Sequence, residues 1–272
     1  MSRLRETFER LHRDGKHALI PFITAGDPDL QTTTDLLVEL AHSGASLIEL
    51  GVPFSDPMAD GPVIQRASIR ALRNKVDVKR ILEVVTQVRR ETDVPIVLFS
   101  YFNPLLQFGT KRLSEEASRA GVDGVLVTDL APEAAQDFAA DLAANDLDYI
   151  SLVAPTSPDE RLALIAERAT GFMYAVSRTG VTGTRSEISN EAEKLVARVR
   201  GVTDLPIAVG FGISTRAHVL EVWRYADAAV VGSAVVAEIE RLATAPDLVK
   251  QIGDFVQALL PEEQLVTGNG IL

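Results

Sequence analysis

The sequence lacks cysteine altogether and is short of positive charge, with 27 lysines and arginines against 38 aspartates and glutamates in 272 residues. Without cysteine the chain can form no disulfide, no thiolate nucleophile and no cysteine-ligated metal site. The net charge of −11 argues against a nucleic-acid partner, because such proteins need a basic surface. These shortages leave an enzyme as the expected class of protein.

Long hydrophobic runs are missing as well. No apolar stretch approaches the roughly 20 residues that a membrane-spanning helix needs. The first fifteen residues, MSRLRETFERLHRDG, are charged throughout and lack the apolar centre of a secretion signal. We therefore expect a cytoplasmic protein with no membrane partner.

Eight short apolar runs alternate with helical patterns along the chain. The runs are rich in valine, isoleucine and leucine without strict alternation, which is typical of parallel strands covered on both faces. Helical patterns such as 29–44 and 78–92 separate the runs, and several end at a glycine or just before a proline. The predicted strands are 18–24, 46–51, 95–101, 124–129, 149–155, 172–177, 206–211 and 228–233.

Eight consecutive βα units predict a (β/α)8 TIM barrel, here with an extra N-terminal helix. Residues 1–272 contain no linker or low-complexity stretch, so we expect a single domain. The extra helix carries Leu4, Phe8 and Leu11 on one face and is expected to close the bottom of the barrel. The alternative is an open, doubly wound sheet. Its dinucleotide fingerprint is poorly matched, because GFGIST (210–215) ends in threonine and occurs late in the chain.

The stretch LIELGVPFSDPMADGP (47–62) places an acid, Glu49, inside an apolar strand. Glu49 lies near the carboxyl end of its predicted strand, where the active sites of barrels are found. Partial desolvation there would raise the pKa of Glu49 and suit it to proton transfer near neutral pH. The alternative is that Glu49 forms a structural ion pair with an arginine.

The loop after this strand carries a second acid, Asp60, and is stiffened by prolines at 53, 57 and 62. Two acids at one barrel mouth suit general acid–base catalysis or stabilisation of a cation.

Glycine-containing turns follow the last three predicted strands, in TGVTGT (179–184), GFGIS (210–214) and GSAVV (232–236). Barrels usually bind phosphate near their last strands through backbone N–H groups and a helix N-terminus. The candidate phosphate-binding residues are Gly183, Gly212, Gly232 and Ser233. The alternative is that the glycines only form tight turns. Residues 177–187 are expected to form a lid, or else a disordered loop.

Several segments together carry a family resemblance. ELGVPFSDPMADGPVIQ (49–65) closely resembles a signature of the tryptophan synthase alpha chain family. The other matching segments occur in the expected order and cover nearly the whole chain; they are FITAGDPD (22–29), SYFNPLLQFG (100–109), APTSPDERL (154–162), VSRTGVTGTR (176–185) and GFGIS (210–214).

The resemblance implies a lyase that cleaves indole-3-glycerol phosphate to indole and glyceraldehyde 3-phosphate. It makes Glu49 the principal acid–base, and Asp60 the group that binds the indole N–H and stabilises positive charge on the ring. A threonine of the lid corresponds to Thr182. The pocket around the substrate would be lined by Phe22, Phe99, Tyr101, Tyr174 and Phe211.

The family also has a partner, a beta chain that carries pyridoxal phosphate and receives indole through a tunnel in an α2β2 complex. The resemblance places Pro53 and Asp56 at positions that touch this partner, and it implies no cofactor in the present chain. Ala131 stands where the family commonly has proline, in a region that also faces the beta chain. Ala131 therefore bears on how tightly the partner docks.

The residue inventory agrees with a reaction that needs no metal and no Schiff base. The four histidines (12, 17, 42 and 218) are scattered, and none is at the carboxyl end of a predicted strand. All six lysines fall outside the predicted strands. Protonation of indole at C3 makes the ring itself an electron sink, so two carboxyl groups would suffice. The alternatives are a catalytically weak barrel that mainly binds the beta chain, and a different phospho-sugar barrel enzyme.

Overall fold

The computed structural model describes residues 2–176, 185–210 and 212–262. Eight parallel strands pair in chain order, and β8 pairs with β1, so the sheet closes into a barrel. The strands are β1 (Ala18–Thr24), β2 (Ile48–Gly51), β3 (Ile96–Ser100), β4 (Gly124–Val127), β5 (Asp148–Val153), β6 (Met173–Val176), β7 (Ile207–Gly210) and β8 (Ala228–Val231). The barrel confirms the (β/α)8 fold predicted from the eight apolar runs.

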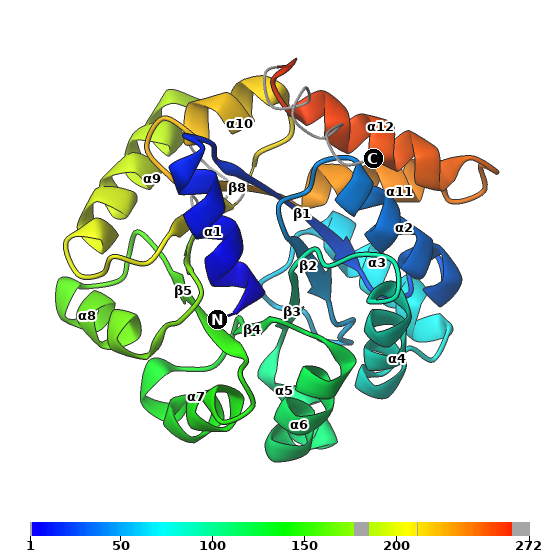
Figure 1. Ribbon diagram of the computed structural model, residues 1–272, viewed down its shortest axis with the longest axis horizontal. Helices are drawn as coiled ribbons and strands as arrows, with labels where there is room; N and C mark the ends of the chain where they lie inside the picture. Colours follow the sequence, from blue (N-terminus) through cyan, green and yellow to red (C-terminus); the bar gives the residue numbers. More distant parts are fainter. Residues whose placement is uncertain (1, 177–184, 211, 263–272) are drawn as a thin grey trace.

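Helices form a ring around this barrel, as Figure 1 shows. The helices described are α1 (Arg3–Arg13), α2 (Leu30–His42), α3 (Pro62–Arg73), α4 (Val78–Val88), α5 (Phe102–Phe108), α6 (Thr110–Ala120), the 3₁₀ helix η1 (Pro132–Ala134), α7 (Gln136–Ala143), α8 (Asp159–Arg168), α9 (Arg185–Arg200), α10 (Arg216–Val222), α11 (Ser233–Leu242) and α12 (Leu248–Leu259). None of these helices is both long enough and apolar enough to cross a membrane.

Local capping sets where the predicted helices begin. Asp29 and Asp77 are the N-cap residues of α2 and α4, and each side chain accepts a hydrogen bond from a first-turn backbone N–H. The helix predicted over 29–44 ends at His42, because Gly44 turns the chain with φ of +94°.

Most of the predicted strands are one or two residues longer than the observed ones. β2 begins at Ile48 rather than at Ser46, and β8 ends at Val231 rather than at Ser233. The end of β8 has a plain cause, since Gly232 leaves the extended conformation and Ser233 already belongs to α11. The remaining strands are found close to their predicted ranges.

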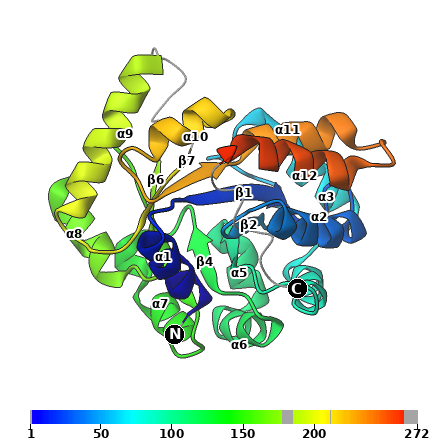
Figure 2. The same cartoon turned by 45° about the horizontal axis from the view of Figure 1, so that its top comes forward.

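The N-terminal helix closes one end of the barrel, and both views show α1 lying across that end (Figures 1 and 2). Leu4 and Phe8 are buried against residues that point into the barrel, and the rings of Phe8 and Phe172 lie 5.7 Å apart. Leu11 is partly buried in the same cluster. The prediction that this helix covers the bottom of the barrel is therefore confirmed.

Candidate active site

Glu49 lies in β2 inside the barrel wall and is 0% exposed. Its neighbours in the strand register are Phe22 of β1 and Val97 of β3. Neither carboxyl oxygen of Glu49 has a hydrogen-bond partner among the described residues. Burial raises the pKa of Glu49 to about 8, so the group is mostly protonated at neutral pH. The described part of the chain therefore offers Glu49 no arginine, which counts against the structural ion pair.

Alternation along β2 explains how the sequence places an acid there. Leu47 belongs to the cluster that fills the barrel interior, and Glu49 follows it on the same face. Ile48 and Leu50 point the other way, into the layer between barrel and helices. An ionised carboxyl in such surroundings would cost several kcal/mol, so the protein holds Glu49 as a neutral acid.

Three aromatic rings form a wall beside Glu49. Phe22 of β1 and Phe99 of β3 meet edge to face with centroids 5.3 Å apart, and Phe99 lies 6.2 Å from Tyr174 of β6. Burial and the nearby charge of Glu49 both raise the pKa of Tyr174, which keeps its hydroxyl protonated. The structure thus brings these three predicted pocket residues together with the predicted catalytic acid.

Two strand glycines, Gly51 and Gly210, make room for this aromatic wall, and the sequence interpretation overlooked them. A Cβ on Gly51 would come within 2.5 Å of the Phe22 ring, and a Cβ on Gly210 would collide with the Tyr174 hydroxyl. Gly51 ends one predicted apolar strand and Gly210 is the last residue but one of another, and a glycine in a strand pattern is a signal of close approach. That signal could have identified both positions.

The second acid, Asp60, is held by Tyr101. The Tyr101 hydroxyl accepts a hydrogen bond of 2.8 Å from the backbone N–H of Ala59, the residue before Asp60. The ring of Phe54 lies 5.2 Å from that of Tyr101, so the loop is packed against it at two points. Burial raises the pKa of Asp60 to about 6, and the nearby Tyr101 hydroxyl acts in the opposite direction.

The two acids therefore differ in charge at neutral pH. Glu49, with a pKa of about 8, is mostly neutral, whereas Asp60, with a pKa of about 6, is mostly ionised. A pair of carboxyl groups whose surroundings separate their pKa values in this way can supply a proton donor and an anion to one substrate.

The last two strands end in the turns that were predicted to bind phosphate. Gly212 follows β7 with φ of +74°, a conformation that favours glycine. Gly232 is the N-cap residue of α11 and Ser233 is its first residue, so the first-turn N–H groups of this ten-residue helix begin directly after β8. This arrangement suits an anion, because the N-terminus of a helix presents free N–H groups and a positive dipole end.

Three other predicted site residues, Thr182, Gly183 and Phe211, lie outside the described residues, as does most of the predicted lid over 177–187.

The predicted partner-facing loop has one buried and one exposed member. Pro53 is buried within the chain, whereas Asp56 is exposed. Met58, between them and Asp60, is 94% exposed, which is unusual for a large apolar side chain. Ala131 lies in the turn that leads into η1.

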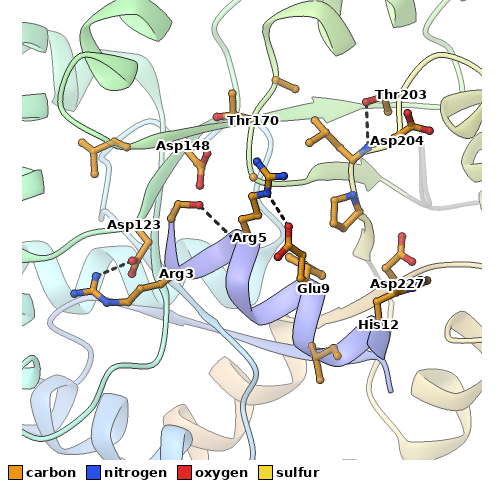
Figure 3. Close-up of a pocket in the computed structure, with 18 of the residues that line it drawn as sticks. Arg3, Arg5, Glu9, His12, Asp123, Asp148, Thr170, Thr203, Asp204 and Asp227 are labelled. Atoms are coloured by element: carbon orange, nitrogen blue, oxygen red, sulfur yellow. Dashed lines mark hydrogen bonds and ion pairs between the residues drawn. The ribbon is translucent and has the colours of Figure 1, made fainter. Parts of the chain in front are cut away.

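A hollow of about 1640 Å³ lies not at this mouth but at the opposite end of the barrel, beside α1. Figure 3 shows two ion pairs beside it, Arg3 with Asp123 and Arg5 with Glu9. Since barrel enzymes use the carboxyl ends of their strands, this hollow is not the candidate active site. No group of three or more histidine, aspartate or glutamate side chains among the residues described is placed to hold a metal ion.

Comparisons with known proteins agree over nearly the whole chain. A family model described as tryptophan synthase alpha chain matches residues 8–259. The tryptophan synthase alpha chain of Citrifermentans bemidjiense is 49% identical over 259 residues, which cover 95% of this chain and 97% of that protein. A crystal structure of tryptophan synthase subunit alpha from Legionella pneumophila superposes with a TM-score of 0.88 at 36% identity, covering 95% and 97% of the two chains. A chain from the tryptophan synthase α2β2 complex of Pyrococcus furiosus superposes with a TM-score of 0.83 at 40% identity, covering 89% of this chain and 97% of its own.

Proposed function

Because the chain belongs to the tryptophan synthase alpha chain family, we propose that Glu49 and Asp60 are the two catalytic carboxyl groups of its reaction. The enzyme is a carbon–carbon lyase that cleaves indole-3-glycerol phosphate to indole and glyceraldehyde 3-phosphate in L-tryptophan biosynthesis. One observation carries the assignment of roles: Glu49 is fully buried beside the aromatic wall and no described residue pairs with its carboxyl group.

The reaction begins with a proton donor, and the neutral Glu49 carboxyl supplies it to C3 of the indole ring. The protonated ring carries positive charge at nitrogen, which the ionised Asp60 stabilises while accepting a hydrogen bond from the ring N–H. The Glu49 carboxylate left by the first step then takes the proton of the side-chain hydroxyl. The bond between C3 and the side chain breaks, its electron pair restores the indole ring, and the hydroxyl carbon becomes the aldehyde.

The remaining assignments concern binding. We assign Phe22, Phe99, Tyr101 and Tyr174 to the indole pocket, with Thr182 and Phe211 added on the family pattern. Backbone N–H groups at Gly212, Gly232 and Ser233, together with Gly183, are assigned to the phosphate.

The chain itself uses no cofactor, and its partner is the pyridoxal-phosphate-dependent beta chain in an α2β2 tetramer. We propose that Asp56 and the exposed Met58 contact this partner, while the buried Pro53 shapes the loop that carries them. We also propose a single barrel domain over 1–272, supported by the closure of all eight strands into one barrel, and a cytoplasmic location, as expected for a biosynthetic enzyme.

Indole release tests the proposal directly. The purified chain is mixed with indole-3-glycerol phosphate, with and without a beta chain, and indole is measured over time. Cleavage that requires Glu49 and Asp60 supports the proposed roles. A chain that activates the beta subunit but releases no indole in either mixture would instead be the catalytically weak binding partner considered above.

A further inference from the structure

A second cavity of about 330 Å³ lies on the outside of the barrel, between the outer faces of β4 and β5 and helix α8. Tyr149 and Ser151 of β5 line it, as does Thr128 at the end of β4. On α8, Arg161, Ile165 and Arg168 line it, a spacing that places all three on one face of the helix. The cavity therefore belongs to the layer between barrel and helices, where apolar side chains normally pack.

The cavity is instead rich in hydrogen-bond donors that have no partner. The guanidinium of Arg168 makes no hydrogen bond or ion pair with the described residues, and its Nη1 is fully buried. Tyr149 and Ser151 are each only 6% exposed, and neither hydroxyl is bonded to a described residue. Buried polar groups are nearly always hydrogen-bonded, and a guanidinium can only donate. The cavity therefore has hydrogen-bond donors available for a ligand that carries acceptors.

The acids near the cavity do not meet this demand. The carboxylate of Asp129 accepts a hydrogen bond of 2.6 Å from the backbone N–H of Phe102. Glu133 lies at the outer rim and pairs with Arg161 at 3.5 Å. Arg168 has no acidic partner among the described residues, so the complementary ligand is an anion with several acceptor oxygens.

We propose that this cavity binds a small oxyanion, a phosphate or carboxylate group of a free metabolite, with Arg168 as the charged donor and Tyr149 and Ser151 as neutral donors. The volume of about 330 Å³ is at the small end of the range found for small-molecule sites. The site is distinct from the barrel mouth, because Tyr149 packs in the layer outside the barrel whereas Ile150, next to it in β5, packs inside.

Calorimetric titration with inorganic phosphate and with succinate tests the proposal. All proteins in this titration, the parent included, carry Ser233→Asp, which places a negative charge at the barrel mouth and weakens anion binding there. Arg168→Met should raise the Kd for the better-bound anion at least about tenfold, because it removes a charged donor. Tyr149→Phe and Ser151→Ala remove one neutral donor each and should raise it by roughly threefold to tenfold.

Arg241→Met is the matched control, because it removes one positive charge from an exposed surface pair with Glu238 and should leave the Kd unchanged. Thermal unfolding of each variant checks that it is folded. Tyr149→Phe keeps the ring in place, so the proposal remains testable even where Arg168→Met does not fold.

A crystal soaked in selenate, a tetrahedral oxyanion like phosphate, locates the ion by anomalous scattering. Density within hydrogen-bond distance of Arg168, together with weaker binding by the Arg168 and Tyr149 variants, supports the proposal. It is overturned if neither phosphate nor succinate binds the parent at millimolar concentration, if the variants bind as tightly as the parent, or if density is seen without binding in solution, which would mark an adventitious ion only.

Discussion

The two ends of the barrel each bury an acid, and they treat it in opposite ways. At the bottom, Asp123 is 4% exposed and accepts bonds from Arg3 at 2.8 Å, Arg89 at 2.7 Å and the backbone N–H of Ile96 at 2.8 Å. At the mouth, Glu49 is 0% exposed and no described residue bonds to its carboxyl group. Burial raises the pKa of both groups, but the charge of Arg89 opposes that rise at Asp123, whereas no described residue opposes it at Glu49.

The difference separates a structural acid from one that is available for chemistry. The pairs made by Asp123 tie α1 and α4 to the start of β4, which anchors the helix that closes the barrel. Glu49 pairs with no described residue, and keeping a carboxyl group unpaired in an apolar wall gains no stability. A group kept at such a cost is best explained by the proposed reaction, in which its neutral form is the proton donor.

The largest expected effect comes from Glu49→Gln. The amide keeps the shape of the side chain but cannot donate a proton, so kcat for indole release should fall about 10²–10⁴-fold. The melting temperature should equal or exceed that of the parent, because no described partner is lost. Single-turnover indole release and thermal unfolding are measured on one preparation. A variant that is destabilised yet cleaves substrate at the parent rate would make Glu49 a structural residue.

Asp123→Asn should show the reverse pattern. It removes the carboxylate that faces the largely buried Arg89, and breaking a buried pair costs about 3–5 kcal/mol of unfolding free energy. Activity per folded molecule should be preserved, because Asp123 is at the far end of the barrel. Denaturant unfolding and kcat are compared with those of Asp254→Asn, which breaks an exposed pair with Lys250 and should cost less than about 1 kcal/mol. If Asp123→Asn lost turnover without losing stability, Asp123 would not be a structural acid.

The pH dependence of kcat/KM should be bell-shaped. The proposed chemistry needs Asp60 ionised and Glu49 protonated, so the acidic limb should lie near the Asp60 pKa of about 6 and the alkaline limb near the Glu49 pKa of about 8. An activity that keeps rising above pH 9 would mean that the glutamate acts only as a carboxylate.

The free energy of unfolding should also depend on the protonation of Glu49. The folded pKa of Glu49 is raised from 4.5 to about 8, so the folded state holds this proton more tightly than the unfolded state. Its contribution to stability is full below pH 4.5 and falls as pH rises toward about 8. Between these values the free energy of unfolding should decline more in the parent than in Glu49→Gln. Parallel curves for the two proteins would show that Glu49 does not have a raised pKa.

The smallest expected effect is that of Tyr101→Phe, which tests how Asp60 is held. Losing one neutral hydrogen bond costs about 1 kcal/mol, so kcat/KM should fall roughly fivefold. The Tyr101 hydroxyl lowers the pKa of Asp60, so its loss should move the acidic limb of the pH profile to higher pH. Tyr225→Phe, in the layer between barrel and helices, is the control and should change neither kcat/KM nor the acidic limb. An unshifted limb would mean that Tyr101 does not contact the ionised acid.

Much of the fold and the candidate site could be predicted because local features carry them. The eight strands follow from runs of apolar residues, and the starts of α2 and α4 follow from their capping aspartates. Glu49 was conspicuous because an acid interrupts such a run, and Asp60 because prolines surround it. These features need only neighbouring residues to be recognised.

The sequence by itself therefore determined the barrel, its closing helix and the identity of the two acids. Only the tertiary structure decided what surrounds each acid. The bond from Ala59 to Tyr101 joins residues 42 positions apart, and that from Arg3 to Asp123 joins residues 120 apart. Asp123 and Arg168 carry no such local signal, because only the closed barrel sets their neighbours. Burial and partners determine whether an acid is paired or free, and closure of the sheet fixes both.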